Sequence, residues 1–236
     1  MTEKSAAQSL SDTAAMLVSS DDVTGTLLGV LQECAEALGA DAVGVVVRAD
    51  HGEVELLSAS SHEASQLEIY QIQQHTGPCL EVLSSGAAVV VIGPDELAAR
   101  WPEVGPSIVD RGFQSVHAVP IRWQGTVFGA LNTFYYGARA LDADEALLLQ
   151  TFADVATLAI LAPARITAER LAELVDTALA GRAVVEQAKG VLAYTHRLSA
   201  SEAYERLLAL AASSEATLTT VSEQVLRGVL RGRAND

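Results

Sequence analysis

One cysteine and one histidine flank a Gly-Pro turn, and they form the first group in the chain whose residue types suit chemistry. Cys79 follows Gly77-Pro78 at the start of a predicted short helix, and His75 precedes the turn. A helix N-terminus and a neighbouring imidazole both lower the pKa of a thiol. Cys79 is therefore a candidate redox residue. The alternative is a small, half-buried side chain that fits a tight turn.

Basic and aromatic side chains form a second group near the C-terminus. Arg182, Lys189, Arg197 and Arg206 recur along predicted helices, and Tyr204 lies among them. From the residues alone this is a small helical bundle with charged faces, and most such bundles are scaffolds or bind partner proteins. In that case each basic position is a solvated charge and Tyr204 is a core residue.

Charge and composition limit what the chain can be. Its 236 residues suit two domains of ordinary size, and half of them are hydrophobic. Residues 1–164 hold 6 Lys/Arg and 21 Asp/Glu, whereas residues 165–236 hold 9 of each. Two cysteines form neither a disulfide framework nor a four-cysteine zinc site. We expect a cytoplasmic protein with no metal, no membrane association and no DNA binding.

The first 160 residues mix helices with short apolar strands. The predicted elements are helix 22–38, strand 42–47, turn 49–52, strand 53–58, helices 64–74 and 79–83, strand 87–92, an irregular or short helical stretch 97–110, strands 114–121 and 126–136, and a long helix from 142. This order predicts an α+β domain built on an antiparallel sheet with helices on one face.

Several phrases in this region resemble the GAF domain, a sensory fold. They are His75-Thr-Gly-Pro-Cys-Leu-Glu-Val-Leu83, Ser115-Val-His-Ala-Val-Pro-Ile121 and Gly129-Ala-Leu-Asn-Thr-Phe134. The resemblance implies a pocket between the sheet and its linking helices, with an unidentified small-molecule ligand and no fixed cofactor. Candidate lining residues are Trp101, Phe113, His117 and Asn132. The alternative is that Trp101 and Phe113 are core residues.

A helical connector follows the GAF-like domain. Apolar residues recur at spacings of three and four as far as Ala180, including Val175 and Ala178. Such a stripe predicts a coiled-coil stalk in a parallel homodimer. Pro163 interrupts the pattern, because proline removes a helical hydrogen bond, and it predicts a joint at that point.

The last 56 residues predict an all-α three-helix bundle. Ser199 and Glu202 have the spacing of a capping box, and Thr220 and Glu223 repeat it. The order and spacing resemble the ANTAR domain, an RNA-binding module of bacterial antiterminators. By position, Gln187-Ala-Lys-Gly190 matches the family's first-helix motif, and Ala203-Tyr204 matches its Ala-aromatic pair. The resemblance implies that paired RNA hairpins in a transcript leader are the partner. It also implies the candidate RNA contacts, in which basic side chains bind phosphates and the tyrosine ring could stack on a loop base: Arg182, Gln187, Lys189, Gly190, Arg197, Tyr204 and Arg206.

Together these features predict four segments: an N-terminal extension 1–20, a GAF-like sensor 21–162, a helical stalk 163–180 and an ANTAR-like domain 181–236. The hypothesis is a non-enzymatic, signal-responsive antitermination regulator that works as a homodimer. Two alternatives stay open. One is a dimerisation or protein-interaction regulator without RNA binding, and the other is a redox sensor based on Cys79.

Overall fold

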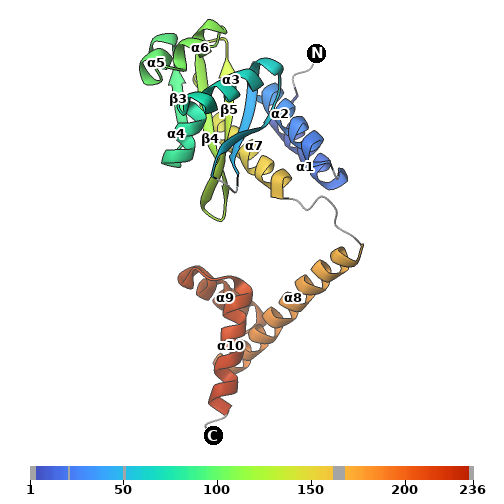
Figure 1. Ribbon diagram of the computed structural model, residues 1–236. Coiled ribbons are helices and arrows are strands. Elements are labelled where there is room, and N and C mark those ends of the chain that lie inside the picture. Colours follow the sequence, from blue (N-terminus) through green and yellow to red (C-terminus); the bar gives the residue numbers. More distant parts are fainter. Residues whose placement is uncertain (1–3, 21, 50–51, 162–167, 234–236) are drawn as a thin grey trace. The chain divides into compact units, whose positions relative to one another are not determined.

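A computed structural model describes residues 4–20, 22–49, 52–161 and 168–233. The chain divides into two compact units, Met1–Ala164 and Arg165–Asp236, and each is described by itself (Figure 1). The first unit contains α1 (Ala6–Ser19), α2 (Val23–Leu38), β1 (Ala42–Arg48), β2 (Val54–Ala59), α3 (His62–Gln74), α4 (Pro78–Ser85), β3 (Val89–Ile92), α5 (Pro94–Arg100), α6 (Gly105–Asp110), β4 (Ser115–Trp123), β5 (Thr126–Tyr135) and α7 (Ala143–Leu161).

The five strands of the first unit form one antiparallel sheet in the order β2-β1-β5-β4-β3. Asn132 in the central strand β5 lies opposite Gly44 in β1 and Ala118 in β4. Because directly opposite residues share a face of the sheet, this register decides which side chains meet. The predicted α+β class and the predicted strands are confirmed.

Each face of the sheet carries its own apolar core, so the prediction of helices on one face only is wrong. One core joins the sheet to α3, α4, α5 and α6, and the other joins it to α2 and α7. Residues 97–110, predicted as irregular or short helical, form α5 and α6 around buried Leu97, Trp101, Val104 and Ile108. This segment is therefore part of the first core.

The N-terminal extension forms a helix that the sequence reasoning did not assign. Ser5 caps α1 by accepting a hydrogen bond from the Gln8 backbone N–H at 3.2 Å. Leu10 and Leu17 pack on the core shared by α2 and α7, and Lys4 forms an ion pair with Glu33 at 2.6 Å. The helix is therefore an integral part of the first unit.

The second unit contains α8 (Ala168–His196), α9 (Ala200–Ser214) and α10 (Leu218–Arg233) (Figure 1). Its core consists of Ala188, Leu192, Ala203, Leu207 and Val221. The predicted division between stalk and bundle at residue 180 falls inside α8, which is one continuous helix. Pro163, the predicted joint, lies outside the described residues.

The two predicted caps of this unit have different outcomes. The capping box at α9 is confirmed: Glu202 N–H donates to the Ser199 hydroxyl at 3.2 Å, and Ser199 N–H donates to the Glu202 carboxylate at 2.8 Å. The predicted box from Thr220 to Glu223 is wrong. Helix α10 begins earlier, and Thr217 accepts the Thr220 N–H at 3.1 Å. Starting earlier lets Leu218 pack against the core of the unit.

Candidate ligand and RNA sites

Four polar side chains meet in the interior of the first unit. Asn132 donates from Nδ2 to Glu68 Oε1 at 2.7 Å, and Gln71 donates from Nε2 to Glu68 Oε2 at 3.0 Å. Cys79 donates from Sγ to Gln71 Oε1 at 3.4 Å. All four side chains are fully buried. We call Glu68, Gln71, Cys79 and Asn132 the buried polar cluster.

The helical repeat explains why α3 contributes two members of the cluster. Its buried residues are Ala64, Leu67, Glu68 and Gln71, the spacing of a core-facing stripe. Glu68 and Gln71 thus occupy positions of the core-facing stripe where apolar side chains would be expected. The sequence reasoning missed both, although this departure from the apolar pattern was a readable signal.

Two glycines make room for the cluster. A Cβ added at Gly44 would lie 2.5 Å from Glu68 Oε1, and one added at Gly77 would lie 2.5 Å from Gln71 Oε1. Gly77 also has a φ of +126°, a conformation that side chains rarely adopt. The backbone is therefore shaped around these polar groups.

Burial sets the protonation of the cluster. Loss of hydration raises the pKa of Glu68 to about 7, against the opposing effect of the Asn132 hydrogen bond. Among the described residues, Asn132 Oδ1 has no hydrogen-bond partner. A buried acceptor without a partner lowers the free energy of unfolding, so this polar group in the core destabilises the unit.

The environment of Cys79 is the opposite of the one expected for a reactive thiol. Burial, followed by the negative charge of Glu68, raises the pKa of Cys79 well above its ordinary range. Cys34 is also fully buried, in the core beside α7. The lowered pKa predicted for Cys79 is wrong, because loss of hydration outweighs the backbone hydrogen bond at Leu80 that favours the thiolate. A redox role for Cys79 stays a prediction.

The structure brings three of the four predicted pocket residues to one face of the sheet. Trp101 and Phe113 belong to the core under α3, α4 and α5, and Asn132 belongs to the buried polar cluster on the same face. His117 lies on the opposite face, opposite Thr133, and its Nε2 is 2.8 Å from the Arg139 carbonyl oxygen. The four residues therefore do not line one pocket.

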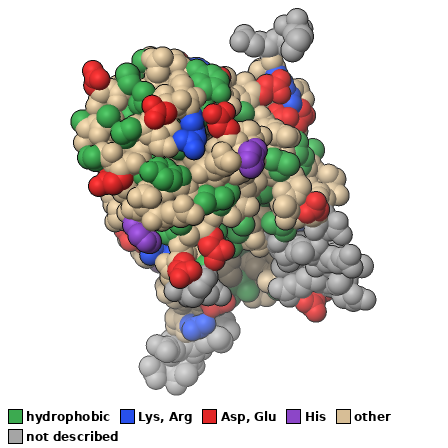
Figure 2. Space-filling view, turned by 45° about the horizontal axis from the view of Figure 1, so that its top comes forward, with side chains coloured by type: hydrophobic (Ala, Val, Ile, Leu, Met, Phe, Trp, Pro, Cys, Tyr) green, Lys and Arg blue, Asp and Glu red, His purple; other side chains and the backbone are tan. Residues whose placement is uncertain are grey.

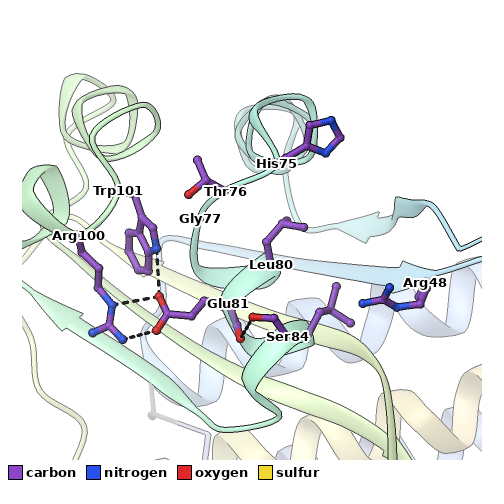
Figure 3. Close-up of a pocket in the computed structure, with 10 residues that line it drawn as sticks. Arg48, His75, Thr76, Gly77, Leu80, Glu81, Ser84, Arg100 and Trp101 are labelled. Atoms are coloured by element: carbon purple, nitrogen blue, oxygen red, sulfur yellow. Dashed lines mark hydrogen bonds and ion pairs between the residues drawn. The ribbon is translucent and has the colours of Figure 1, made fainter.

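A surface pocket of about 480 Å³ lies beside Trp101 (Figure 3). It is lined by Arg48, His75, Thr76, Gly77, Leu80, Glu81, Leu83, Ser84, Arg100 and Trp101. Figure 3 shows Arg100 and Trp101 directed at Glu81 on one side of α4, with Arg48 on the other side. Trp101 Nε1 donates to Glu81 Oε2 at 3.2 Å, and Arg100 binds the same carboxylate. The predicted residue Trp101 thus lines a pocket at its polar edge.

The second unit gathers three predicted RNA contacts around one hollow. A surface hollow of about 360 Å³ is lined by Arg182, Val185, Glu186, Lys189, Tyr204 and Leu218. Lys189 forms an ion pair with Glu186 at 2.5 Å, and Tyr204 is 40% exposed. Two cations, one of them paired with the Glu186 carboxylate, and an aromatic ring therefore border the same concave surface.

The other predicted RNA contacts are exposed but lie elsewhere on the unit. Gln187, Gly190, Arg197 and Arg206 are exposed and do not line the hollow. A Cβ added at Gly190 would meet nothing within 4 Å, so packing inside this unit does not require glycine there. Tyr194, which the sequence reasoning missed, is 88% exposed.

The first unit is an antiparallel sheet with helices on both faces, and the second is a small module of three helices. The family model for the GAF domain matches residues 22–160, and the model for the ANTAR domain matches residues 173–226. The chain belongs to the GAF domain family and is a GAF–ANTAR regulator. It joins a sensor domain to an RNA-binding antitermination module.

Solved structures confirm the fold of the first unit. The free methionine-R-sulfoxide reductase from Neisseria meningitidis, solved with its substrate, is 17% identical with a TM-score of 0.51; the match covers 67% of this chain and 89% of that one. The GAF domain of a phosphoenolpyruvate-protein phosphotransferase from Coxiella burnetii is 19% identical with a TM-score of 0.51, covering 68% and 94%. No curated protein matches the chain.

Surface charge and hydropathy agree with the composition of the chain. On the face shown in Figure 2, acidic side chains are spread among hydrophobic ones, and basic side chains are few. Within the ranges that the structure describes, no helix combines the length and apolar character needed to span a membrane.

Proposed function

We propose that the protein is a signal-responsive antitermination regulator that binds paired RNA hairpins in a transcript leader. Its ANTAR unit contacts the RNA, and its GAF unit controls whether two such units are arranged to engage two hairpins. The observation that carries the proposal is the hollow bordered by Arg182, Lys189 and Tyr204 in a unit that matches the ANTAR family.

The chemistry of this hollow suits a folded RNA. Lysine and arginine side chains contact phosphates without reading sequence, and an exposed aromatic ring stacks on a base that leaves the helix. The unit as a whole is electrically neutral, with 9 Lys/Arg and 9 Asp/Glu in residues 165–236. Phosphate attraction by the whole unit is therefore small, and the local grouping of Arg182 with Lys189 has to supply it.

Replacing Lys189 by Gln should weaken binding of a paired-hairpin RNA about tenfold near 0.1 M salt and reduce the salt slope by about 1. A variant with one phosphate contact fewer releases one counterion fewer when it binds RNA. Both the affinity and its dependence on salt therefore decrease. Arg182→Gln should behave in the same way. Fluorescence anisotropy of a labelled hairpin at 50 and 200 mM salt measures both quantities.

The matched control is Arg227→Gln, which removes the same charge from α10. Arg227 forms an exposed ion pair with Glu223 at 2.9 Å and does not line the hollow. It should leave affinity and slope nearly unchanged. If wild-type protein fails to prefer the paired hairpin over scrambled RNA, or if all three variants weaken binding equally, the proposed RNA surface is wrong.

We also propose that the homodimer forms along α8. Val175, Leu179 and Tyr194 are 48%, 55% and 88% exposed, and the helical repeat places them on one side of this 29-residue helix. Leu179→Glu should convert a dimer at micromolar concentration into a monomer, because it places charge in an apolar seam. Thr177→Glu adds the same charge on another side and should leave the dimer intact. Light scattering measures the mass, and a monomeric wild type would contradict the proposal.

A further inference from the structure

The pocket beside Trp101 concentrates positive charge in an acidic domain. Residues 1–164 contain 6 Lys/Arg against 21 Asp/Glu, and two of the six, Arg48 and Arg100, line this pocket. His75 adds an imidazole, and the side-chain hydroxyls of Thr76 and Ser84 add hydrogen-bonding groups. The other charged side chains of this domain are mostly carboxylates, which attract cations and repel anions. A pocket lined by two arginines therefore stands out as a place where an anion could bind.

The one carboxylate in the lining is already neutralised. Glu81 accepts hydrogen bonds from Arg100 Nε at 3.1 Å and from Trp101 Nε1 at 3.2 Å. The hydrogen bond from Arg100 holds the pKa of Glu81 below its ordinary value, so the carboxylate and the guanidinium form a compensated pair. This pair fixes the indole of Trp101 at the edge of the pocket.

Arg48 supplies the positive charge that is left over. Among the residues that the structure describes, its guanidinium has no hydrogen-bond or ion-pair partner. Figure 3 shows this guanidinium directed toward α4, across the pocket from the Arg100–Glu81 pair. An anionic group beside Arg48 would gain a charge-assisted hydrogen bond without first displacing an internal carboxylate.

We propose that this pocket binds a small organic anion, either a carboxylate or a phosphate monoester. The anionic group contacts Arg48, and an apolar body packs against Leu80, Leu83 and the indole of Trp101. The volume of about 480 Å³ suits a molecule of metabolite size. Binding of the anion is inferred from this geometry alone. A role of the anion as the input signal rests on the regulator function proposed above.

The wall of the pocket connects it to the buried polar cluster. Thr76 and Gly77 form part of the lining, and Gly77 also packs against the Gln71 side chain, where an added Cβ would lie 2.5 Å from Oε1. Cys79 follows two residues later and donates its hydrogen bond to the same oxygen. An anion that moves this turn would therefore also move the hydrogen bonds of the cluster.

The experiment measures ligand binding by the full chain without RNA. The probes are phenyl phosphate and benzoate, with benzyl alcohol as the uncharged analogue. Trp101 and Trp123 are the two tryptophans of the chain, and Trp123 is 48% exposed on the β4–β5 hairpin. Trp123→Phe therefore leaves Trp101 as the reporter of fluorescence, and calorimetry on the unmodified chain checks the affinity.

We expect at least one anion to bind at least tenfold more tightly than benzyl alcohol. Tighter binding of phenyl phosphate assigns a phosphate monoester, and tighter binding of benzoate assigns a carboxylate. Arg48→Gln should weaken binding of that anion about tenfold. Arg111→Gln is the matched control, because Arg111 donates to the Ser107 carbonyl oxygen at 2.9 Å outside the pocket.

Three outcomes would overturn the proposal: no saturable binding of either anion at millimolar concentration by folded protein, equal binding of benzyl alcohol, or equal weakening by Arg48→Gln and Arg111→Gln. Circular dichroism of each variant establishes that it is folded. Because no RNA is present, a negative result leaves the RNA-binding proposal standing. A failure of RNA binding likewise leaves this site untouched.

Discussion

Replacing Glu68 by Gln should raise the free energy of unfolding of the GAF unit at pH 8 by up to about 3 kcal/mol, and by less than about 1 kcal/mol at pH 5. Burial raises the pKa of Glu68 from an ordinary value of 4.5 to about 7 in the folded protein. The folded state thus favours the protonated acid. Its stabilising contribution is complete below pH 4.5 and is lost as the pH rises through about 7.

Glutamine removes this dependence because it is uncharged at every pH. Its carbonyl oxygen can accept the hydrogen bond from Asn132 Nδ2, and its amide can donate to Gln71 once the Gln71 amide turns over. Urea unfolding at pH 5, 6, 7 and 8 measures the effect. Trp101 and Trp123 both lie in the GAF unit, so tryptophan fluorescence reports its unfolding alone.

The informative quantity is the difference between variant and wild type, because other carboxylates contribute their own pH dependence to both. Glu103→Gln is the control: Glu103 is an exposed carboxylate of the same unit, and its replacement should leave the profile parallel to that of the wild type. Parallel profiles for Glu68→Gln would show that Glu68 is already ionised in the folded protein at pH 5.

Replacing Phe113 by Ala should destabilise the GAF unit by about 3–5 kcal/mol, a large part of the stability of an ordinary domain. The Phe113 side chain is fully buried. Its ring stacks on Tyr136 at 4.8 Å between centroids and tilts against Phe134 at 5.5 Å. Truncation removes these contacts and leaves a cavity in the close-packed core. Urea unfolding at pH 7 measures the loss.

Trp123→Ala is the control for Phe113→Ala, since Trp123 is 48% exposed and should cost little. Phe113→Leu should fall between the two, because it keeps most of the apolar volume. A loss below about 1 kcal/mol for Phe113→Ala would contradict the core assignment. It would return Phe113 to the lining of an open ligand pocket.

Local signals in the sequence placed many elements well. The Ser199–Glu202 box gave the start of α9, and the helix predicted over residues 22–38 ends at Gly39, which has a φ of +58°. Where two local signals competed, the sequence was ambiguous. Thr217 and Thr220 both suit a helix cap, and the choice depended on burying Leu218, which is a property of the folded unit.

The polar sites needed the tertiary structure. His117 and Asn132 look equally suited to a pocket, but Ala118 is the residue opposite Asn132, so His117 faces away from it. A shift of one residue in strand register would reverse this outcome. The irregularity between Ile121 and Arg122, which shifts the register of this hairpin, was not predicted from the sequence.

The sequence by itself determined that the chain has an acidic α+β sensor followed by a neutral three-helix module. Hydrophobic periodicity and helix caps depend on residues close together in the chain, and charge depends on composition. Both can therefore be predicted from the sequence. Only the tertiary structure decided that Glu68 meets Asn132, that Arg48 shares a pocket with Arg100, and that Arg182 and Tyr204 border one hollow. These pairs are distant in the chain, and the packing of whole elements brings them together. Loss of hydration in the core then raises the pKa values of Glu68 and Cys79 above the ordinary values of these residue types.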